Sequence, residues 1–489
     1  MFSVTYLGQQ GWLIAGARGR ILVDPLLTDE YSPGFQAAIY PPRTFDHARF
    51  PPIDAVVLSH EHADHLSVPS LALLDRRIPV ILPARSARAL RDVISRLGFR
   101  VVAAEAGAGF AAGELAIRLL AGEAPRDAEL ESEWSALQIL VADRAGDGSF
   151  FSYVDSWPGD DTIALLRRTV GRVGLFCHVN NTMDWSVLEG GIATGWPRAT
   201  LDYAAEVIAA EARWWRGDEA PALTAVCGPG LAFVGADAWM NQILCADSER
   251  VCEALRALAP ERAFRSPLPG ETIAFRRGRV QLTARRAAFV RALERRRWPS
   301  LRVARRRALL EDYAPACGRR ALDDGAWPDL ERELDRLAAY LYRRSLFRTL
   351  HALEGRALGR RRPAFALVLR AGDGDHAYVL EYEASASRFT RVDRRAPAEA
   401  YVAGLECWAS DLWCVLAGRL LPQRLLGHAR TWSYSPIPLS PLQALWGFFD
   451  LANRPAAAAA FYGPLVERIR DRPPVIRAGR HARAVRALR

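Results

Sequence analysis

Eight residues near the N-terminus, 59–66, limit the possible folds of this chain most strongly. They read Ser-His-Glu-His-Ala-Asp-His-Leu and follow an apolar, β-branched run at 53–58. Three of the nine histidines in the chain and two carboxylates therefore fall within six positions. Imidazole and carboxylate groups gathered in a loop at the end of a strand are typical of a metal site.

The spacing within this loop predicts how the side chains divide between ions. Side chains alternate along an extended segment, so His60 and His62 face the same way and can share one metal ion. Asp64 and His65 follow on the next turn and can reach a second ion. The loop thus predicts a site for two metal ions.

The segments around this loop alternate between two periodicities. Short apolar or β-branched runs bounded by turn residues predict strands at 4–7, 12–14, 20–23, 53–58, 78–82, 100–103, 115–120, 137–141 and 150–154. Helical spacing predicts helices at 71–74, 84–97, 203–215 and 248–258. Strands that alternate with helices predict an α/β core.

An arginine-dense stretch at 276–307 marks a change in the chain. We expect a first domain at 1–275 and a second at 276–489, in line with the usual domain size of roughly 100–200 residues. The arginines recur at helical spacing, which predicts a solvated helix face or, as the alternative, a patch for an anionic partner. Beyond them we expect helices near 330–353, 399–421 and 441–448, and a hairpin of 364–369 and 378–382 that turns at 371–374. The second domain is therefore expected to be α+β.

Composition restricts the partners and the compartment. The net charge of +10 rests on arginine alone, because the chain contains no lysine, and we take this as biased residue usage and not as a nucleic-acid signal. Seven cysteines without a CxxC pair predict reduced thiols in a cytoplasmic protein. The N-terminus lacks a signal-peptide pattern, and no apolar run approaches a membrane span.

The loop residues His60, His62, Asp64 and His65 match in full the HxHxDH motif of the metallo-β-lactamase superfamily, which this sequence resembles over roughly residues 1–270. The superfamily's preceding strand, which ends in Asp-Pro, matches residues 21–25. The resemblance implies a metallo-β-lactamase-like αββα sandwich, here followed by the second, α+β domain, which would bind the substrate.

The resemblance also implies further ligands. Family members bridge both metals with an Asp after a later strand, which corresponds to Asp155. The last ligand of the pattern is a histidine, and His178 is either that ligand or a structural residue. Hydrolases of the superfamily carry one more histidine after the strand that corresponds to 115–120, but residues 101–150 contain none. Glu123 is the candidate at this place, ahead of Asp127 and Glu129.

A glutamate in place of a histidine shifts the ligand set from imidazole-rich, which suits zinc, toward carboxylate-rich, which suits iron or manganese. In this respect the chain resembles the non-heme diiron oxygenase branch of the superfamily, which includes hydroxylases of the chloramphenicol and platensimycin pathways. That resemblance implies two irons, an external electron donor and O2-dependent hydroxylation of a small natural-product molecule, free or attached to a carrier. Asp64 and Asp155 would act in catalysis.

Two other functions remain open. A zinc hydrolase would use a metal-bound hydroxide, oriented by Asp64 or Asp155, to attack a lactone, amide or phosphodiester, and the absent histidine counts against it. A scaffold protein that keeps the fold but binds little metal would leave the HxHxDH motif unexplained.

Overall fold

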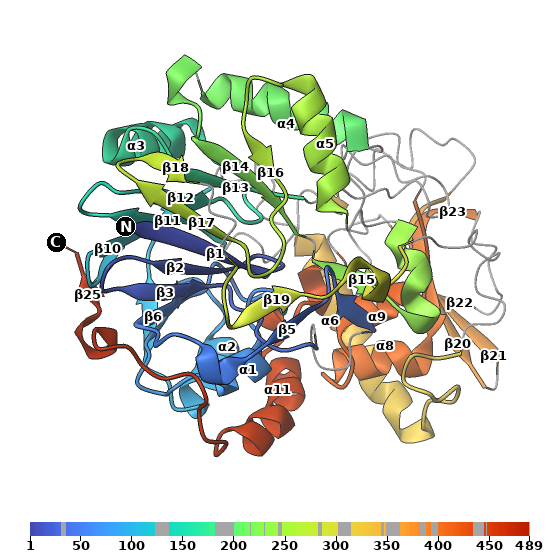
Figure 1. The fold of residues 1–489 in the computed structure, drawn as a ribbon. Coiled ribbons are helices and arrows are strands. Elements are labelled where there is room, and N and C mark those ends of the chain that lie inside the picture. Colours follow the sequence, from blue (N-terminus) through green and yellow to red (C-terminus); the bar gives the residue numbers. More distant parts are fainter. Residues whose placement is uncertain are drawn as a thin grey trace.

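The computed structural model describes residues 1–30, 36–122, 136–180, 200–215, 217–228, 230–242, 247–281, 286–301, 314–343, 347–348, 362–372, 374–381, 388–392, 400–433, 445 and 447–488. In these residues two eight-stranded sheets form the N-terminal part, and a five-stranded sheet forms most of the C-terminal part (Figure 1).

The first eight-stranded sheet has the order β18-β17-β1-β2-β3-β6-β7-β8. Its strands are β1 Phe2–Gly8, β2 Gly11–Ala15, β3 Arg20–Val23, β6 Ala55–Val57, β7 Val80–Pro83, β8 Val101–Ala104, β17 Thr272–Arg276 and β18 Arg279–Gln281. Strands β3, β6, β7 and β8 run parallel to one another. Parallel strands are covered on both faces, which explains why these segments read as continuous apolar runs.

The second eight-stranded sheet has the order β16-β14-β13-β12-β11-β10-β9-β25. Its strands are β9 Gly109–Ala112, β10 Leu115–Ala121, β11 Leu137–Asp143, β12 Ser149–Ser152, β13 Leu175–Val179, β14 Leu223–Cys227, β16 Phe264–Arg265 and β25 Arg486–Ala487. The predicted strands at 115–120, 137–141 and 150–154 therefore pair in one sheet, as β10, β11 and β12.

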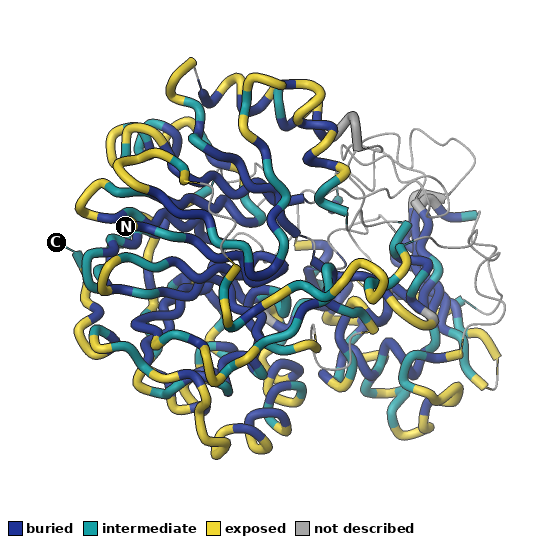
Figure 2. Tube along the Cα trace, viewed as in Figure 1, coloured by how far each residue is buried: buried dark blue, intermediate teal, exposed yellow. Residues whose placement is uncertain are grey.

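The two sheets face each other, and helices cover their outer faces (Figures 1 and 2). Buried side chains of both sheets, such as Trp12 and Ile139, form the core between them. The outer face of the first sheet is covered by α1 Val68–Ala72, α2 Arg88–Arg96 and α11 Pro455–Ile469. The outer face of the second sheet is covered by α3 Asp160–Val170, α4 Thr200–Trp214 and α5 Ser248–Leu258. The predicted αββα sandwich is confirmed.

The C-terminal part contains a five-stranded sheet in the order β22-β21-β20-β23-β24. Its strands are β20 Arg362–Ala371, β21 Gly374–Glu381, β22 Thr390–Val392, β23 Tyr401–Trp408 and β24 Arg430–Ser433. Its helices are α6 Trp327–Arg343, α8 Ala409–Leu416 and α9 Pro422–Gly427. The predicted hairpin is confirmed, because β20 and β21 pair antiparallel with Ala371 opposite Gly374. This part of the chain is α+β, as expected.

Two helix predictions were wrong. The described part of 276–307 contains β18, β19 Val290–Ala292 and a three-residue 3₁₀ helix, and β19 pairs with β5 Arg43–Phe45. The first half of 399–421 forms β23, which pairs in parallel with β20, and only the second half is helical. In both places pairing with a strand distant in sequence overrides the local pattern. Of the predicted helix at 441–448, residues 441–444 and 446 lie outside the described part.

The end of the chain returns to the N-terminal sheets (Figure 1). Helix α11 packs against α1 and α2, and β25 pairs with β9. A further two-stranded sheet joins β4 Ala37–Ile39 to β15 Leu231–Phe233. The division into domains at 1–275 and 276–489 stays a prediction. None of the described helices is long and apolar enough to cross a membrane.

Candidate metal centre

The predicted metal loop lies at the carboxyl edge of the first sheet. Strands β3 and β6 are parallel neighbours, so the residues that follow them, Asp24 and Ser59, meet at the same edge. Ser59 donates its backbone N–H to Asp24 Oδ1 at 2.8 Å and its hydroxyl to Asp24 Oδ2 at 2.6 Å. Asp24 has φ 39°, in the left-handed region that Asp tolerates better than most residues. The carboxylate of Asp24 thus fixes the start of the loop.

The loop then closes in a turn that gathers three imidazoles. His65 and Leu66 donate their backbone N–H groups to the carbonyl oxygen of His62, at 2.9 and 2.7 Å. The rings of His60 and His62 lie 4.5 Å apart between centroids, and those of His60 and His65 lie 4.1 Å apart. His60 and His65 are each only 1% exposed. Burial of this many polar rings is typical of a metal site and not of a solvated loop.

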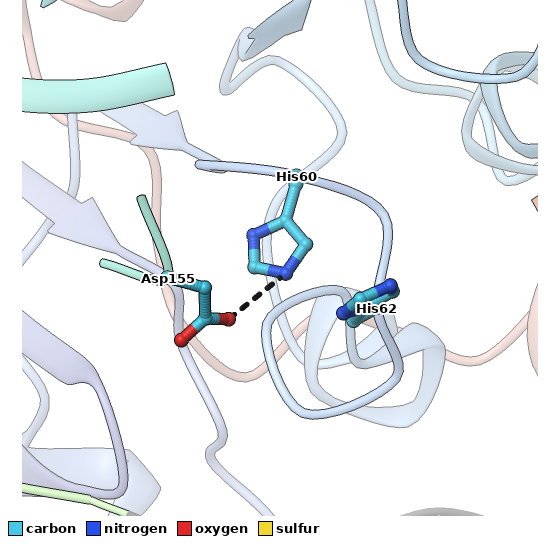
Figure 3. Close-up of side chains that lie close together, drawn as sticks. All are labelled: His60, His62 and Asp155. Atoms are coloured by element: carbon cyan, nitrogen blue, oxygen red, sulfur yellow. Dashed lines mark ion pairs between the residues drawn. The ribbon is translucent and has the colours of Figure 1, made fainter. Parts of the chain in front are cut away.

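Asp155 enters from the opposite sheet. It follows β12 after Val154, whose φ is 54°. Its Oδ2 lies 3.2 Å from His60 Nε2 and 3.3 Å from His65 Nε2. Figure 3 shows the ion pair with His60 and the nearby ring of His62. This carboxylate oxygen lies between two imidazoles that the sequence assigns to different ions, and the role of Asp155 as a bridging ligand stays a prediction.

The structure brings one ligand atom each of His60, His62 and Asp155 within 4.8 Å of one another. Ligand atoms about 2.0–2.2 Å from one ion lie at most about 4 Å apart, so a small closing movement would let these three hold one metal. Nitrogen and carboxylate donors together suit zinc or iron. These residues therefore fit a divalent metal ion.

Asp64 and His65 form the other half of the candidate centre. Asp64 Oδ2 lies 3.1 Å from His65 Nε2 and accepts a hydrogen bond of 2.9 Å from Gln9 Nε2. The opposite nitrogen of His65, Nδ1, lies 2.9 Å from Asp24 Oδ2. Since Asp24 occupies Nδ1, the Nε2 atom of His65 is the one that faces Asp64 and Asp155.

Burial and mutual charge set the protonation of these groups. Burial favours a raised pKa for Asp155, but hydrogen bonds and charge from His60 and His65 outweigh it and hold this pKa well below its usual range. Burial opposes the charged form of His65 too, yet the carboxylates of Asp64 and Asp24 raise its pKa. Despite burial, His65 lowers the pKa of Asp64 to about 2. Both carboxylates are therefore ionised at neutral pH, the form that binds metal.

Burial lowers the pKa of His60, and the neighbouring His65 and His62 lower it further. Its imidazole is therefore neutral at pH 7, as a metal ligand must be. Ser59 Oγ lies 2.9 Å from its Nδ1, which leaves Nε2 toward Asp155.

The remaining predicted ligands lie elsewhere or outside the described residues. His178 is fully buried on β13, where the hydroxyl of Tyr153 bonds to its Nδ1. Burial, and then the charge of Arg262, lowers the pKa of His178 to about 3. In the described part of the chain the group of potential ligands with His60 does not include His178, so its ligand role stays a prediction.

Glu123, Asp127 and Glu129 lie outside the described residues. The backbone on either side of them reaches the site. A Cβ atom on Gly122 would lie 2.5 Å from Ser156 Oγ, next to Asp155. Leu137 donates its N–H to the carbonyl oxygen of Ser59 at 3.0 Å.

Sequence reasoning missed three residues that contact the loop: Asp24, Gln9 and Asp450. Asp24 belongs to the Asp-Pro pair that was recognised, but it had no assigned role. No pattern in the sequence marked Gln9 or Asp450 as a partner of the loop. Gln9 lies 55 residues before its partner Asp64, and Asp450 lies 388 residues after its partner His62.

Comparison with known proteins finds a family model that matches part of the N-terminal sandwich. Residues 19–152 match the family described as the beta-lactamase superfamily domain. No curated protein matches the chain.

Several solved structures are similar at low identity. CmlA, a diiron beta-hydroxylase from Streptomyces venezuelae, is 18% identical over 56% of this chain and 54% of its own, with a TM-score of 0.36. The chain thus spans about half the length of CmlA. A metallo hydrolase from Ignicoccus hospitalis is 14% identical over 56% of this chain and 98% of its own, with a TM-score of 0.35. An isothiocyanate hydrolase from Delia radicum gut bacteria is 16% identical over 56% and 99%, with a TM-score of 0.36.

The family match lies within the two central sheets and contains the loop of His60, His62, Asp64 and His65. Residues 19–152 of this chain are therefore similar to the beta-lactamase superfamily domain, and the two sheets that contain them have the αββα architecture of the metallo-β-lactamase fold.

Proposed function

We propose that this protein is a dinuclear non-heme iron monooxygenase that hydroxylates a small molecule, free or attached to a carrier. One ion would be held by His60, His62 and the bridging Asp155, and the other by Asp64, His65 and Asp155. The carboxylate of Glu123 would complete the set in place of a histidine, with His178 as a further ligand of the second ion. The observation that carries the proposal is the absence of histidine from residues 101–150, which leaves a carboxylate to complete the donor set where hydrolases of the superfamily use an imidazole.

The position of Gly122 supports Glu123 as the ligand. Gly122 lies against Ser156, the residue after Asp155, and Glu123 is joined to Gly122 by one peptide bond. Gly122, the last described residue before position 123, therefore lies beside the candidate centre.

Hydroxylation needs a C–H bond, O2, two electrons and two protons, and it yields C–OH and water. The electrons come from an external one-electron donor. Two irons, when bound, supply the O2 chemistry, which belongs to the cofactor. The protein orients the ligands: Asp24 holds the ring of His65, and Gln9 holds the carboxylate of Asp64. Burial of His60 and His65 excludes water from their side of the centre.

A zinc hydrolase of a lactone, amide or phosphodiester is the second candidate. The observation that favours it is the cluster of three imidazoles at His60, His62 and His65, which also suits zinc. In that case Asp64 or Asp155 would orient the attacking water.

The test loads the metal-free protein with Fe(II) under anaerobic conditions, reduces it and exposes it to O2. We expect O2 to generate a visible absorption band in the wild type. The Glu123→Gln variant should lose one of the two irons and, with it, the absorption band. Glu129→Gln is the matched control and should retain both. Activity of the zinc-loaded protein on chromogenic lactones, amides or phosphodiesters, without an O2 response of the iron form, would overturn the proposal in favour of the hydrolase.

A further inference from the structure

A carboxylate from the C-terminal part of the chain reaches the candidate metal centre. Asp450 Oδ2 lies 3.3 Å from His62 Nε2, and each side chain is about one-fifth exposed. His62 belongs to the loop after β6, whereas Asp450 lies just before α11. The contact therefore joins the metal loop to a segment 388 positions farther along the chain.

The contact identifies Nε2 as the nitrogen of His62 that faces the C-terminal segment. The ring of His62 stands edge-on in Figure 3, with one nitrogen on the side of His60 and Asp155 and the other on the far side. Asp450 contacts Nε2, and one ligand atom of the His62 ring lies within 4.8 Å of those of His60 and Asp155. His65 shows the same arrangement with the nitrogens exchanged, since Asp24 engages Nδ1 and Nε2 faces the cluster.

The backbone on both sides of Asp450 is anchored. Phe449 is fully buried in the core of the C-terminal sheet, and Leu451 is buried in the core beneath α1, α2 and α11. Asn453 donates its backbone N–H to the carbonyl oxygen of Asp450 at 3.1 Å. Arg454 donates to Glu333 Oε2 at 2.6 Å and to the carbonyl oxygen of Leu416 at 2.8 Å. The Asp450 carboxylate is thus held near His62 by a backbone that is anchored in a hydrophobic core on each side.

The surroundings of Asp450 are also partly apolar. Burial, and then the nearby Asp450 carboxylate, raises the pKa of the Tyr462 hydroxyl of α11. Tyr462 is only 4% exposed, so the Asp450 carboxylate has a buried side chain near it. A carboxylate in such a position gains more from a charged or N–H partner than one in water does.

We propose that Asp450 is a positioning residue of the metal centre, which accepts the Nε2–H of His62 and so directs Nδ1 to the metal. A carboxylate behind a ligating imidazole fixes its tautomer and orientation and increases its basicity. The proposal rests on the proposed metal site, and it gives the C-terminal part of the chain a direct role there.

The first test measures metal affinity. Full-length protein is freed of metal and loaded with Zn²⁺ in competition with a chelator. We expect Asp450→Ala to weaken one of two sites about 10- to 100-fold, the usual effect of losing such a partner. Asp450→Asn keeps an acceptor oxygen and the side-chain shape, so it should weaken this site less. Asp471→Asn, at an exposed position in the same part of the chain, is the control and should bind as the wild type does.

The second test identifies the nitrogen that binds the metal. Long-range ¹H–¹⁵N spectra of the zinc-loaded protein, labelled at histidine, should show His62 bound through Nδ1 with a protonated Nε2. The His62→Gln variant assigns the signal. Asp450→Asn should broaden or shift that signal while circular dichroism stays unchanged.

The outcomes separate this inference from the proposed function. If the wild type and Asp450→Ala bind two zinc ions equally well, Asp450 has no positioning role, although the metal site stands. A His62 bound through Nε2 would also overturn the inference, because the proton that Asp450 accepts would be absent. A wild type that binds no metal would overturn both proposals.

Discussion

Among the single residues, Asp24 makes the contacts that best explain the conformation of the metal loop. Its two oxygens accept from the N–H and the hydroxyl of Ser59, and Oδ2 also lies 2.9 Å from His65 Nδ1. The Asp-Pro pair was visible in the sequence, but its role was not, because the parallel pairing of β3 with β6 brings it to the loop.

Replacing Asp24 should therefore weaken metal binding without disturbing the backbone. Asn tolerates the left-handed φ of 39°, so Asp24→Asn removes the charge and keeps the turn. We expect affinity for the ion at His65 to fall about 10- to 100-fold. Chelator competition measures this fall. Asp54→Asn, which also removes a buried carboxylate that accepts backbone N–H groups, should lower stability and leave metal affinity unchanged.

The four HxHxDH residues were predictable because they lie within one loop. The partners of these residues were not, since Gln9 and Asp450 come close only after the sheets and the C-terminal segment have folded. Nothing in local composition distinguishes them from ordinary polar residues.

At the element scale, the strands of the two central sheets followed from their apolar runs, whereas β23 did not. Residues 399–421 have a helical distribution of apolar side chains, but β23 pairs with β20 and β24. Only the tertiary contact with Trp432 shows why the segment contains Gly404. A Cβ atom at position 404 would lie 2.1 Å from the Trp432 ring.

Gly404→Ala tests this strand assignment directly. In a helix the change would stabilise the protein by about 1 kcal/mol. In the strand, the added methyl group would overlap the Trp432 ring. We therefore expect the free energy of unfolding, measured with urea, to fall by about 1–3 kcal/mol. Gly372→Ala, in the β20–β21 hairpin with only ordinary contacts, should be close to neutral.

The buried Glu211 of α4 predicts a pH dependence of stability. Burial raises its pKa from 4.5 to about 7, although the adjacent Arg262 opposes this shift. The folded state thus holds the proton more tightly than the unfolded state, so the free energy of unfolding should fall between pH 4.5 and 7, by at most about 3 kcal/mol. Glu211→Gln should remove this dependence in urea titrations. A wild-type stability that rises through this range would mean that the ion pair with Arg262 dominates.

At the scale of the whole molecule, the N-terminal and C-terminal parts are joined at several places. Helix α11 and strand β25 return to the sandwich, and Asp237 lies in a buried cluster with Arg424 and His428 of the C-terminal part. The sequence predicted the sandwich and an α+β part, but not these connections, because each depends on residues more than 180 positions apart.

Breaking the buried cluster should destabilise the protein strongly. Asp237→Asn leaves Arg424 without its carboxylate in a site where both side chains are under 7% exposed. We expect the free energy of unfolding to fall by about 3–5 kcal/mol, which would appear as a lower melting temperature. The exposed pair of Arg96 and Glu467 provides the comparison, and Glu467→Gln should cost less than about 1 kcal/mol. Equal effects of the two changes would contradict the importance of the buried cluster.

The function of this protein depends on the metal that it binds at His60, His62, Asp64, His65 and Asp155. Metal content should be measured by plasma mass spectrometry on full-length protein purified without added metal, together with its visible spectrum. We predict about two irons per chain with visible absorption, both lost in the Asp155→Asn variant. Two zinc ions without a visible band would contradict the oxygenase, and a protein without bound metal would contradict the metal centre itself.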